Sequence, residues 1–137
     1  MSGKVLIIDD EPDVSTYLEM ALQANGFEAQ VANSVDDGME KLDRFCPDLI
    51  CLDIMMPKKS GLTFYTHLRG GDNRKHIPVI IISGVTTDGE FDIHSFVPDD
   101  EIPPPECFFE KPIDVEEFVR TVKRLIKSSM TWKGRKR

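Results

Sequence analysis

The sequence lacks any apolar run that approaches the roughly 20 residues of a membrane span. Its first residues lead directly into a short strand-like segment and do not resemble a signal peptide. Its three cysteines form no C-x-x-C pair, which argues against a zinc cluster and against a disulfide framework. We therefore expect a cytoplasmic protein without a membrane span, whose cysteines pack as small apolar side chains.

The 137 residues are 40% hydrophobic and 30% charged, which is typical of one globular domain with its own core. The net charge is −7, but residues 120–137 hold eight of the 17 basic residues and no acidic one. The remainder is strongly acidic and should repel nucleic acid, which argues against a nucleic-acid partner. We divide the chain into a folded domain over residues 1–128 and a basic C-terminal tail over residues 129–137.

Short continuous apolar segments alternate with longer segments in which apolar residues recur every three or four positions. The short segments predict five strands, at residues 5–8, around 31, 49–52, 79–82 and 107–109. Consecutive apolar positions suit strands of a parallel sheet that helices cover on both faces. Because crossover connections are right-handed, the alternation predicts an α/β fold with a doubly wound five-stranded parallel sheet.

The helical segments have recognisable ends. Pro12 lies in the first turn of the first helix, which ends near Gly26 and should turn Tyr17 and Leu18 towards the core. Ser34 is the expected N-cap of the second helix, and the third begins near residue 60. Asp114 should cap the last helix. Residues 84–106 are acidic and rich in proline, so we expect the fourth helix to be short or irregular.

Charged or hydroxyl-bearing residues directly follow four of the predicted strands. They are Asp9, Asp10 and Glu11 after the first, Asp53 after the third, Ser83 after the fourth and Lys111 after the fifth. Sites of doubly wound sheets lie at the carboxyl ends of the strands, so these residues can meet in one crevice. Each residue taken alone has an ordinary explanation as a helix cap or a solvated side chain.

Carboxylates that share one crevice repel one another, by roughly 4 kcal/mol for a pair about 4 Å apart at an effective dielectric near 20. A divalent cation with oxygen ligands would offset this repulsion, and Mg²⁺ suits a few carboxylates together with water and a phosphate oxygen. Lys111 and Ser83 then make sense as ligands of a phosphoryl group. Asp53 is the best-placed nucleophile, because it stands alone after the central strand, whereas the adjacent Asp9 and Asp10 suit the ion.

The chain resembles a response regulator receiver domain, the phosphoacceptor module of two-component signalling. The matching segments are residues 5–12 (VLIIDDEP), 48–57 (DLICLDIMMP) with Gly61, 78–84 (PVIIISG) and 108–112 (FFEKP). The resemblance implies a flavodoxin-like sheet of strand order 2-1-3-4-5, with residues 1–128 as the receiver domain. It also implies that Asp53 accepts a phosphoryl group from a phosphohistidine of a sensor histidine kinase or a histidine phosphotransfer protein.

The resemblance further implies roles for the other site residues. Asp10, Asp53 and the backbone carbonyl of Met55 would hold Mg²⁺, with Asp9 acting through water. Ser83 and Lys111 would contact the phosphoryl group, and Lys111–Pro112 would be a cis peptide. On phosphorylation Ser83 would move towards the phosphoryl group and Phe108 would swing inward. Phe108 could equally be a fixed core side chain.

Three functions remain open at this point. The first is a phosphoacceptor switch that assists its own phosphorylation and dephosphorylation, is not a turnover enzyme, and acts on an unidentified downstream protein by contact. The second is a metal-dependent phosphatase with an aspartyl intermediate. The adjacent Asp9 and Asp10 disfavour it, because such enzymes generally carry D-x-D after the first strand. The third is a receiver-like binding module that works without phosphorylation.

Overall fold

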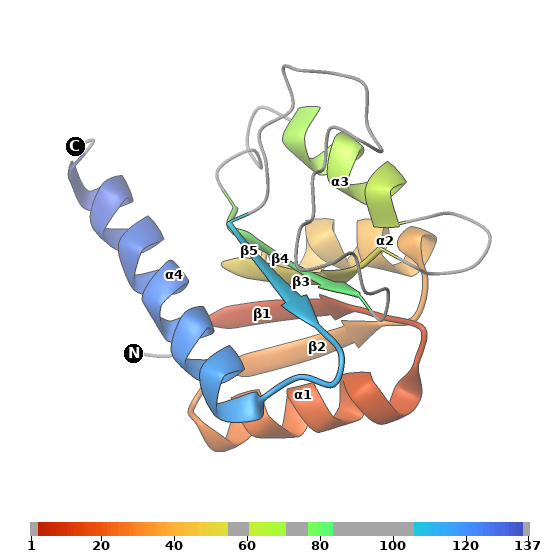
Figure 1. Cartoon of the computed structure of the whole chain (residues 1–137). Coiled ribbons are helices and arrows are strands. Elements are labelled where there is room, and N and C mark those ends of the chain that lie inside the picture. The colour runs from red at the N-terminus through yellow and green to blue at the C-terminus, as the bar shows by residue number, and fades with distance from the viewer. Residues whose placement is uncertain (1–2, 55–60, 71–76, 84–105, 136–137) are drawn as a thin grey trace.

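The structure, a computed structural model, describes residues 3–54, 61–70, 77–83 and 106–135, with side chains except those of 61–63, 70, 83 and 129–135. These ranges contain five strands and four helices (Figure 1). In chain order they are β1 (Lys4–Ile8), α1 (Pro12–Ala24), β2 (Glu28–Ala32), α2 (Val35–Phe45), β3 (Leu49–Asp53), α3 (Gly61–Gly70), β4 (Val79–Ser83), β5 (Cys107–Glu110) and α4 (Val115–Arg135). The fourth helix expected from the sequence falls outside the described residues.

The five strands form one parallel sheet in the order β2-β1-β3-β4-β5, as predicted. Helices α1 and α4 contact each other on one face of the sheet, and α2 and α3 contact each other on the opposite face (Figure 1). The strand order reverses direction between β1 and β3, which both lie inside the sheet. The carboxyl ends of β1 and β3 are therefore neighbours, and in such sheets this point forms a crevice.

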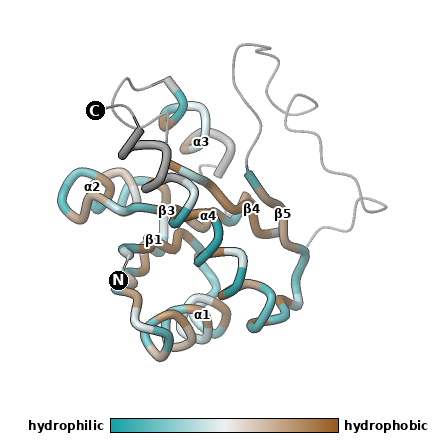
Figure 2. Tube along the Cα trace, turned by 90° about the vertical axis from the view of Figure 1, so that its left-hand side faces the viewer, coloured by the Kyte–Doolittle hydropathy of each residue, from teal (hydrophilic) through white to brown (hydrophobic). Residues whose placement is uncertain are grey.

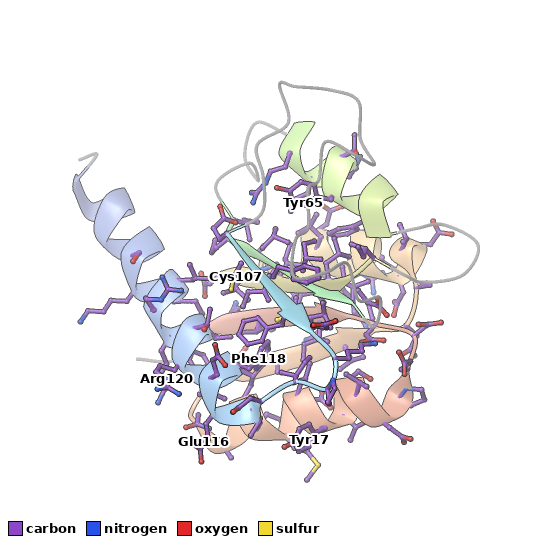
Figure 3. All side chains as sticks on the ribbon, viewed as in Figure 1. Tyr17, Tyr65, Cys107, Glu116, Phe118 and Arg120 are labelled. Carbon is purple, nitrogen blue, oxygen red and sulfur yellow. The ribbon has the colours of Figure 1, made fainter. Side chains whose placement is uncertain are left out.

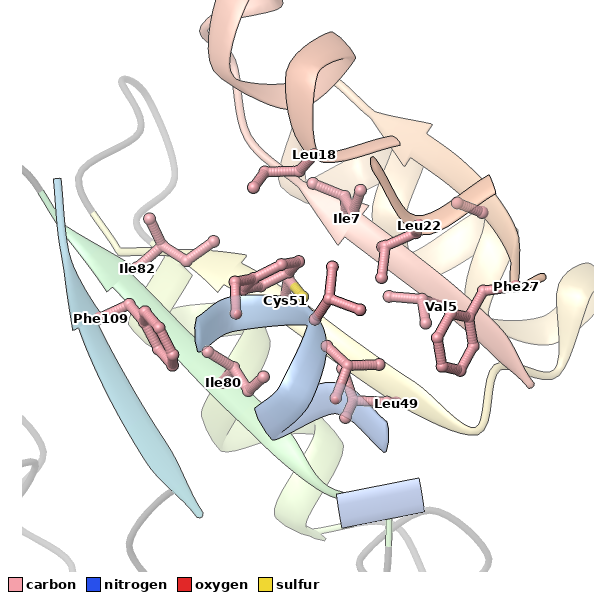
Figure 4. Packing of buried hydrophobic residues seen from close by; sticks show 14 of the residues in the cluster. Val5, Ile7, Leu18, Leu22, Phe27, Leu49, Cys51, Ile80, Ile82 and Phe109 are labelled. Atoms are coloured by element: carbon pink, nitrogen blue, oxygen red, sulfur yellow. The ribbon is translucent and has the colours of Figure 1, made fainter. Parts of the chain in front are cut away.

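The three inner strands, β1, β3 and β4, are buried on both faces, with successive side chains pointing to opposite sides of the sheet. In β1, Val5 and Ile7 pack with α1 and α4, whereas Leu6 and Ile8 pack with α2 and α3. Figure 4 shows the first of these two core layers, and Figure 2 shows the apolar residues concentrated along the strands. The consecutive apolar residues of the sequence therefore fill two cores, one on each face of the sheet. This packing fixes the carboxyl ends of the strands.

Side-chain caps begin two of the helices where the sequence predicts them. The Ser34 hydroxyl accepts a hydrogen bond from the Asp37 backbone N–H at 3.1 Å. Oδ1 of Asp114 accepts bonds from the backbone N–H groups of Glu116 and Glu117 at 3.0 and 3.2 Å. Each cap satisfies N–H groups that have no partner inside the helix.

One expectation about the helices is wrong. Tyr17 does not face the core but is 53% exposed, because Ser15, Leu18 and Leu22 form the buried stripe of α1 (Figure 3). The last helix continues to Arg135, so residues 129–135 of the proposed basic tail are helical. No proline or glycine interrupts this stretch before Gly134, and such residues are what terminate helices.

Partly buried polar contacts anchor the start of β5, at the end of the sheet opposite the crevice. The Arg69 guanidinium donates to the Ile77 carbonyl at 2.7 Å and to Oε1 of Glu106 at 2.8 Å. The same carboxylate oxygen accepts a bond from the Val79 backbone N–H at 2.7 Å. These bonds tie the end of α3 to the first residues of β4 and β5, and so fix the strand that leads to Lys111.

Replacement of Phe118 by alanine tests the core beneath α4. Phe118 is fully buried and meets Phe109 edge-to-face, with ring centroids 5.8 Å apart (Figure 3). We expect Phe118→Ala to lower the free energy of unfolding by about 3 to 5 kcal/mol in urea titrations, because it leaves a cavity. Arg120→Ala, on the exposed side of the same helix, should change it by less than about 0.5 kcal/mol. Similar losses in both variants would contradict this packing.

Candidate functional site

Three aspartates meet at the carboxyl ends of the two central strands. Asp9 directly follows β1 and Asp53 is the last residue of β3, and the two strands pair with Ile8 opposite Leu52. One carboxylate oxygen each from Asp9, Asp10 and Asp53 lies within 4.8 Å of the others. Asp9 is fully buried and Asp53 is 2% exposed, whereas Asp10 is more open to solvent. The fold therefore forces like charges together in a place where water screens them poorly.

The ammonium group of Lys111 lies among these acids. Lys111 directly follows β5, and its Nζ is 3.3 Å from Oδ2 of Asp9 and 3.4 Å from Oδ2 of Asp53. It also donates a hydrogen bond to the carboxylate of Glu11, the residue before α1. The peptide bond between Lys111 and Pro112 is cis, as predicted. Residues more than 50 positions apart in the chain thus meet at one ammonium group.

Burial and neighbouring charges shift the pKa values of two of these groups. Burial raises the pKa of Asp9 from 3.8 to about 6, against a hydrogen bond from the Glu11 backbone N–H, and the charge of Asp53 raises it further. Burial alone would lower the pKa of Lys111, but its hydrogen bond to Glu11 and the charges of Asp53 and Asp9 outweigh burial and raise it. Lys111 is therefore protonated at neutral pH, and ionised Asp9 is costly.

The donor set fits a hard divalent cation. Asp9, Asp10 and Asp53 offer carboxylate oxygens at close range, and such oxygens are the ligands that Mg²⁺ and Ca²⁺ prefer. Oδ2 of Asp9 is buried and accepts no hydrogen bond of good geometry, although the Lys111 ammonium lies 3.3 Å away. An acceptor left in this condition is costly, and a bound cation would satisfy it. The residues present can therefore hold a metal ion at this point.

The other predicted site residues are placed only in part. Ser83 ends β4, and its backbone is in register with Glu110 of β5 at the crevice edge, but its side chain lies outside the described residues. Met55 also lies outside them. Phe108 is half-buried and packs against the core on the α2 and α3 face. The structure therefore brings Asp9, Asp10, Asp53 and Lys111 together and gives no side-chain geometry for Ser83 or Met55.

The contact between Glu11 and Lys111 is a feature that sequence reasoning missed. Glu11 occupies the N-cap position of α1, but its side chain makes no capping hydrogen bond. Serine, threonine, aspartate and asparagine are the residues that cap helices well, and glutamate is not among them. A glutamate at this position is a signal that its carboxylate serves another partner.

Comparison with known proteins places this arrangement in a family. The family model described as the response regulator receiver domain matches residues 5–123. A DNA-binding dual master transcriptional regulator, RpaA of Synechocystis, is 32% identical over 126 residues, which cover 90% of this chain and 49% of that protein. The transcriptional regulatory protein PrrA of Mycobacterium leprae is 32% identical over 130 residues, or 92% of this chain and 51% of that protein. The chain thus spans about half the length of these curated relatives.

Solved structures show the same fold at low sequence identity. A CheY-like receiver domain protein from Methanospirillum hungatei superposes with a TM-score of 0.81 at 17% identity, over 96% of this chain and 98% of that chain. The chemotaxis response regulator CheY4 of Vibrio cholerae gives 0.78 at 22% identity, over 91% and 99% of the two chains. The five-stranded arrangement is therefore retained where most residues differ.

Replacement of Asp9 by asparagine tests the electrostatic cost of the site. We expect metal-free Asp9→Asn to be more stable than the wild type by about 1 to 2 kcal/mol at pH 7.5, since a pKa raised from 3.8 to about 6 means that ionised Asp9 destabilises the fold. The gain should shrink as the pH falls from about 6 towards 4, because the folded wild type then binds a proton at Asp9. Urea unfolding with a chelator measures both effects, and a destabilised variant at pH 7.5 would contradict them.

Proposed function

Because this chain belongs to the response regulator receiver domain family, we propose that it is a phosphoacceptor switch of a two-component phosphorelay. Asp53 is the proposed phosphorylation site. The observation that carries the proposal is the Lys111 ammonium 3.4 Å from the Asp53 carboxylate, in a crevice that also holds Asp9 and Asp10. A buried carboxylate beside a fixed cation and a set of metal ligands suits transfer of a phosphoryl group and has no evident structural purpose.

In the proposed reaction a carboxylate oxygen of Asp53 forms a bond to phosphorus. The bond between phosphorus and the imidazole nitrogen of a phosphohistidine breaks, and that nitrogen keeps the electron pair. Lys111 and the hydroxyl of Ser83 are proposed to bind the phosphoryl oxygens. Asp10, Asp53 and the Met55 carbonyl would hold Mg²⁺, with Asp9 acting through water. When bound, the ion neutralises charge on the transferred phosphoryl oxygens.

The proposed switch follows from the charge that phosphorylation adds, close to two negative charges at neutral pH. Ser83 would move towards this charge, and Phe108 would follow into the space vacated. Phe108 packs from the edge strand β5 against the core, so a rotation of its ring would change the exposed surface near β4 and β5. The output is proposed to be contact with a downstream protein.

The proposed phosphoryl donor is a sensor histidine kinase or a histidine phosphotransfer protein in the cytoplasm. A cavity of about 210 Å³ opens beside the site, and Lys111 and Pro112 line it together with Val14 and Tyr17 of α1. The exposed Tyr17 and Met20 extend this apolar surface along α1. Because the cavity shares Lys111 with the phosphorylation site, a protein seated here would bring its phosphohistidine near Asp53. The described helices include none that could span a membrane.

Incubation with acetyl phosphate tests the phosphorylation site. We expect the wild type to gain one phosphoryl group by intact mass, with Mg²⁺ and not with a chelator, as an acid-stable and base-labile adduct. Asp53→Asn should gain none, because an amide is not a nucleophile under these conditions. Asp43→Asn, at an exposed position of α2, is the matched control and should behave as the wild type. Absence of an adduct in the wild type would favour a module that works without phosphorylation.

Substitution on α1 tests the donor surface separately. Transfer profiling against the phosphorylated histidine kinases of the source organism identifies the donor. We expect Tyr17→Glu to slow transfer from that donor by about tenfold or more, since a charge would enter an apolar contact. Phosphorylation by acetyl phosphate should not change, and Gln23→Glu, also exposed on α1, should affect neither reaction. Equal slowing with both phosphoryl donors would contradict a docking role.

A further inference from the structure

Glu11 binds the ammonium group that the phosphoryl group would need. Its carboxylate pairs with Nζ of Lys111, and the two side chains differ in exposure, at 58% for Glu11 and 13% for Lys111. This hydrogen bond is the largest of the contributions that raise the pKa of Lys111. Lys111 is therefore held from the solvent side by Glu11 and from the crevice side by Asp9 and Asp53.

The Glu11 side chain does not cap the helix that follows it. Glu11 precedes Pro12 at the start of α1, and its carboxylate makes no capping hydrogen bond to the helix. Its backbone N–H donates to Oδ1 of Asp9 at 2.9 Å, which fixes the main chain beside the crevice. The side chain then extends from this fixed point to Lys111.

An ammonium group has three N–H donors, and here it donates to Glu11 and Asp53 and lies 3.3 Å from the Asp9 carboxylate. A phosphoryl group on Asp53 would bring further acceptor oxygens with a larger charge. Asp53 would carry that group and Asp9 would face the cation, so Glu11 is the acid that would compete with the phosphoryl group for Lys111. The negative charge of Glu11 would also oppose the approach of an anionic phosphoryl donor.

We propose that Glu11 is a positioning residue that restrains Lys111 and thereby slows phosphoryl uptake at Asp53. The proposal rests on the proposed function of Asp53 and names a regulator of that same site. The step affected is attack of the Asp53 carboxylate on phosphorus. With acetyl phosphate the bond from phosphorus to the acetyl oxygen breaks, and acetate leaves with the electron pair.

Two variants of Glu11 separate the restraint from simple charge repulsion. Glu11→Gln removes the charge and weakens the bond to Lys111. Glu11→Asp keeps the charge but shortens the side chain, and aspartate at an N-cap turns towards the helix N–H groups and so away from Lys111. Both variants should take up phosphoryl from acetyl phosphate about fivefold faster at saturating Mg²⁺, as expected for release of an exposed ion pair.

Glu19→Gln is the matched control, because it makes the same substitution on α1 two turns away. It should leave the rate unchanged. Acceleration in Glu11→Gln alone would overturn the restraint and leave only a charge effect, and an unchanged or slower rate in both variants would overturn the proposal. Failure of the wild type to accept phosphoryl at all would instead refute the proposed function, so the two failures are distinguishable.

Hydrogen exchange at the Lys111 ammonium provides a readout without metal or phosphoryl donor. In ¹⁵N-detected spectra of the metal-free protein, its N–H protons should exchange with water several-fold faster in Glu11→Gln and Glu11→Asp than in the wild type or Glu19→Gln. Loss of a hydrogen-bond partner exposes these protons to solvent. Equal exchange rates in all four proteins would show that Glu11 does not hold Lys111, whatever the phosphorylation rates are.

Discussion

The ammonium group of Lys111 is what allows several carboxylates to share one small space. Two like charges about 4 Å apart cost roughly 4 kcal/mol at an effective dielectric near 20, and Asp9 and Asp53 are almost completely buried. Lys111 offsets part of this cost through its contacts with Asp9, Asp53 and Glu11. Because the compensation is partial, the site retains a demand for positive charge, which a divalent cation would meet and which phosphorylation would increase. The proposed metal binding and phosphorylation would both draw on that imbalance.

The scaffold holds this imbalance in place because the sheet is packed on both faces. Strands β1 and β3 bring Asp9 and Asp53 together at their carboxyl ends. Neither strand can shift without disturbing the packing of both cores. Lys111 follows the outer strand β5. The partly buried contact between Arg69 and Glu106 fixes the other end of this strand.

The chain shares its fold, but not most of its residues, with the solved structures it resembles, and it is shorter than its curated relatives. The two solved structures share the fold at 17 and 22% identity, so the fold persists when most residues differ. Curated relatives such as RpaA and PrrA are about twice as long as this chain, and their transcriptional functions are those of the whole proteins. The part that the solved structures share with this chain is the five-stranded fold.

The sequence by itself determined the strands, the caps at Ser34 and Asp114, the doubly wound parallel sheet and the meeting of Asp9, Asp10, Asp53 and Lys111. These follow from apolar patterning and strand-end position, which are local or topological properties. The order of the strands in the sheet was implied by the resemblance to receiver domains and is confirmed by the structure. Tertiary structure decided the outward position of Tyr17, because the side of α1 that is buried depends on how the helix packs against the sheet. It also decided that Glu11 turns to Lys111, since a bond between residues 100 positions apart depends on side-chain geometry that no local pattern specifies.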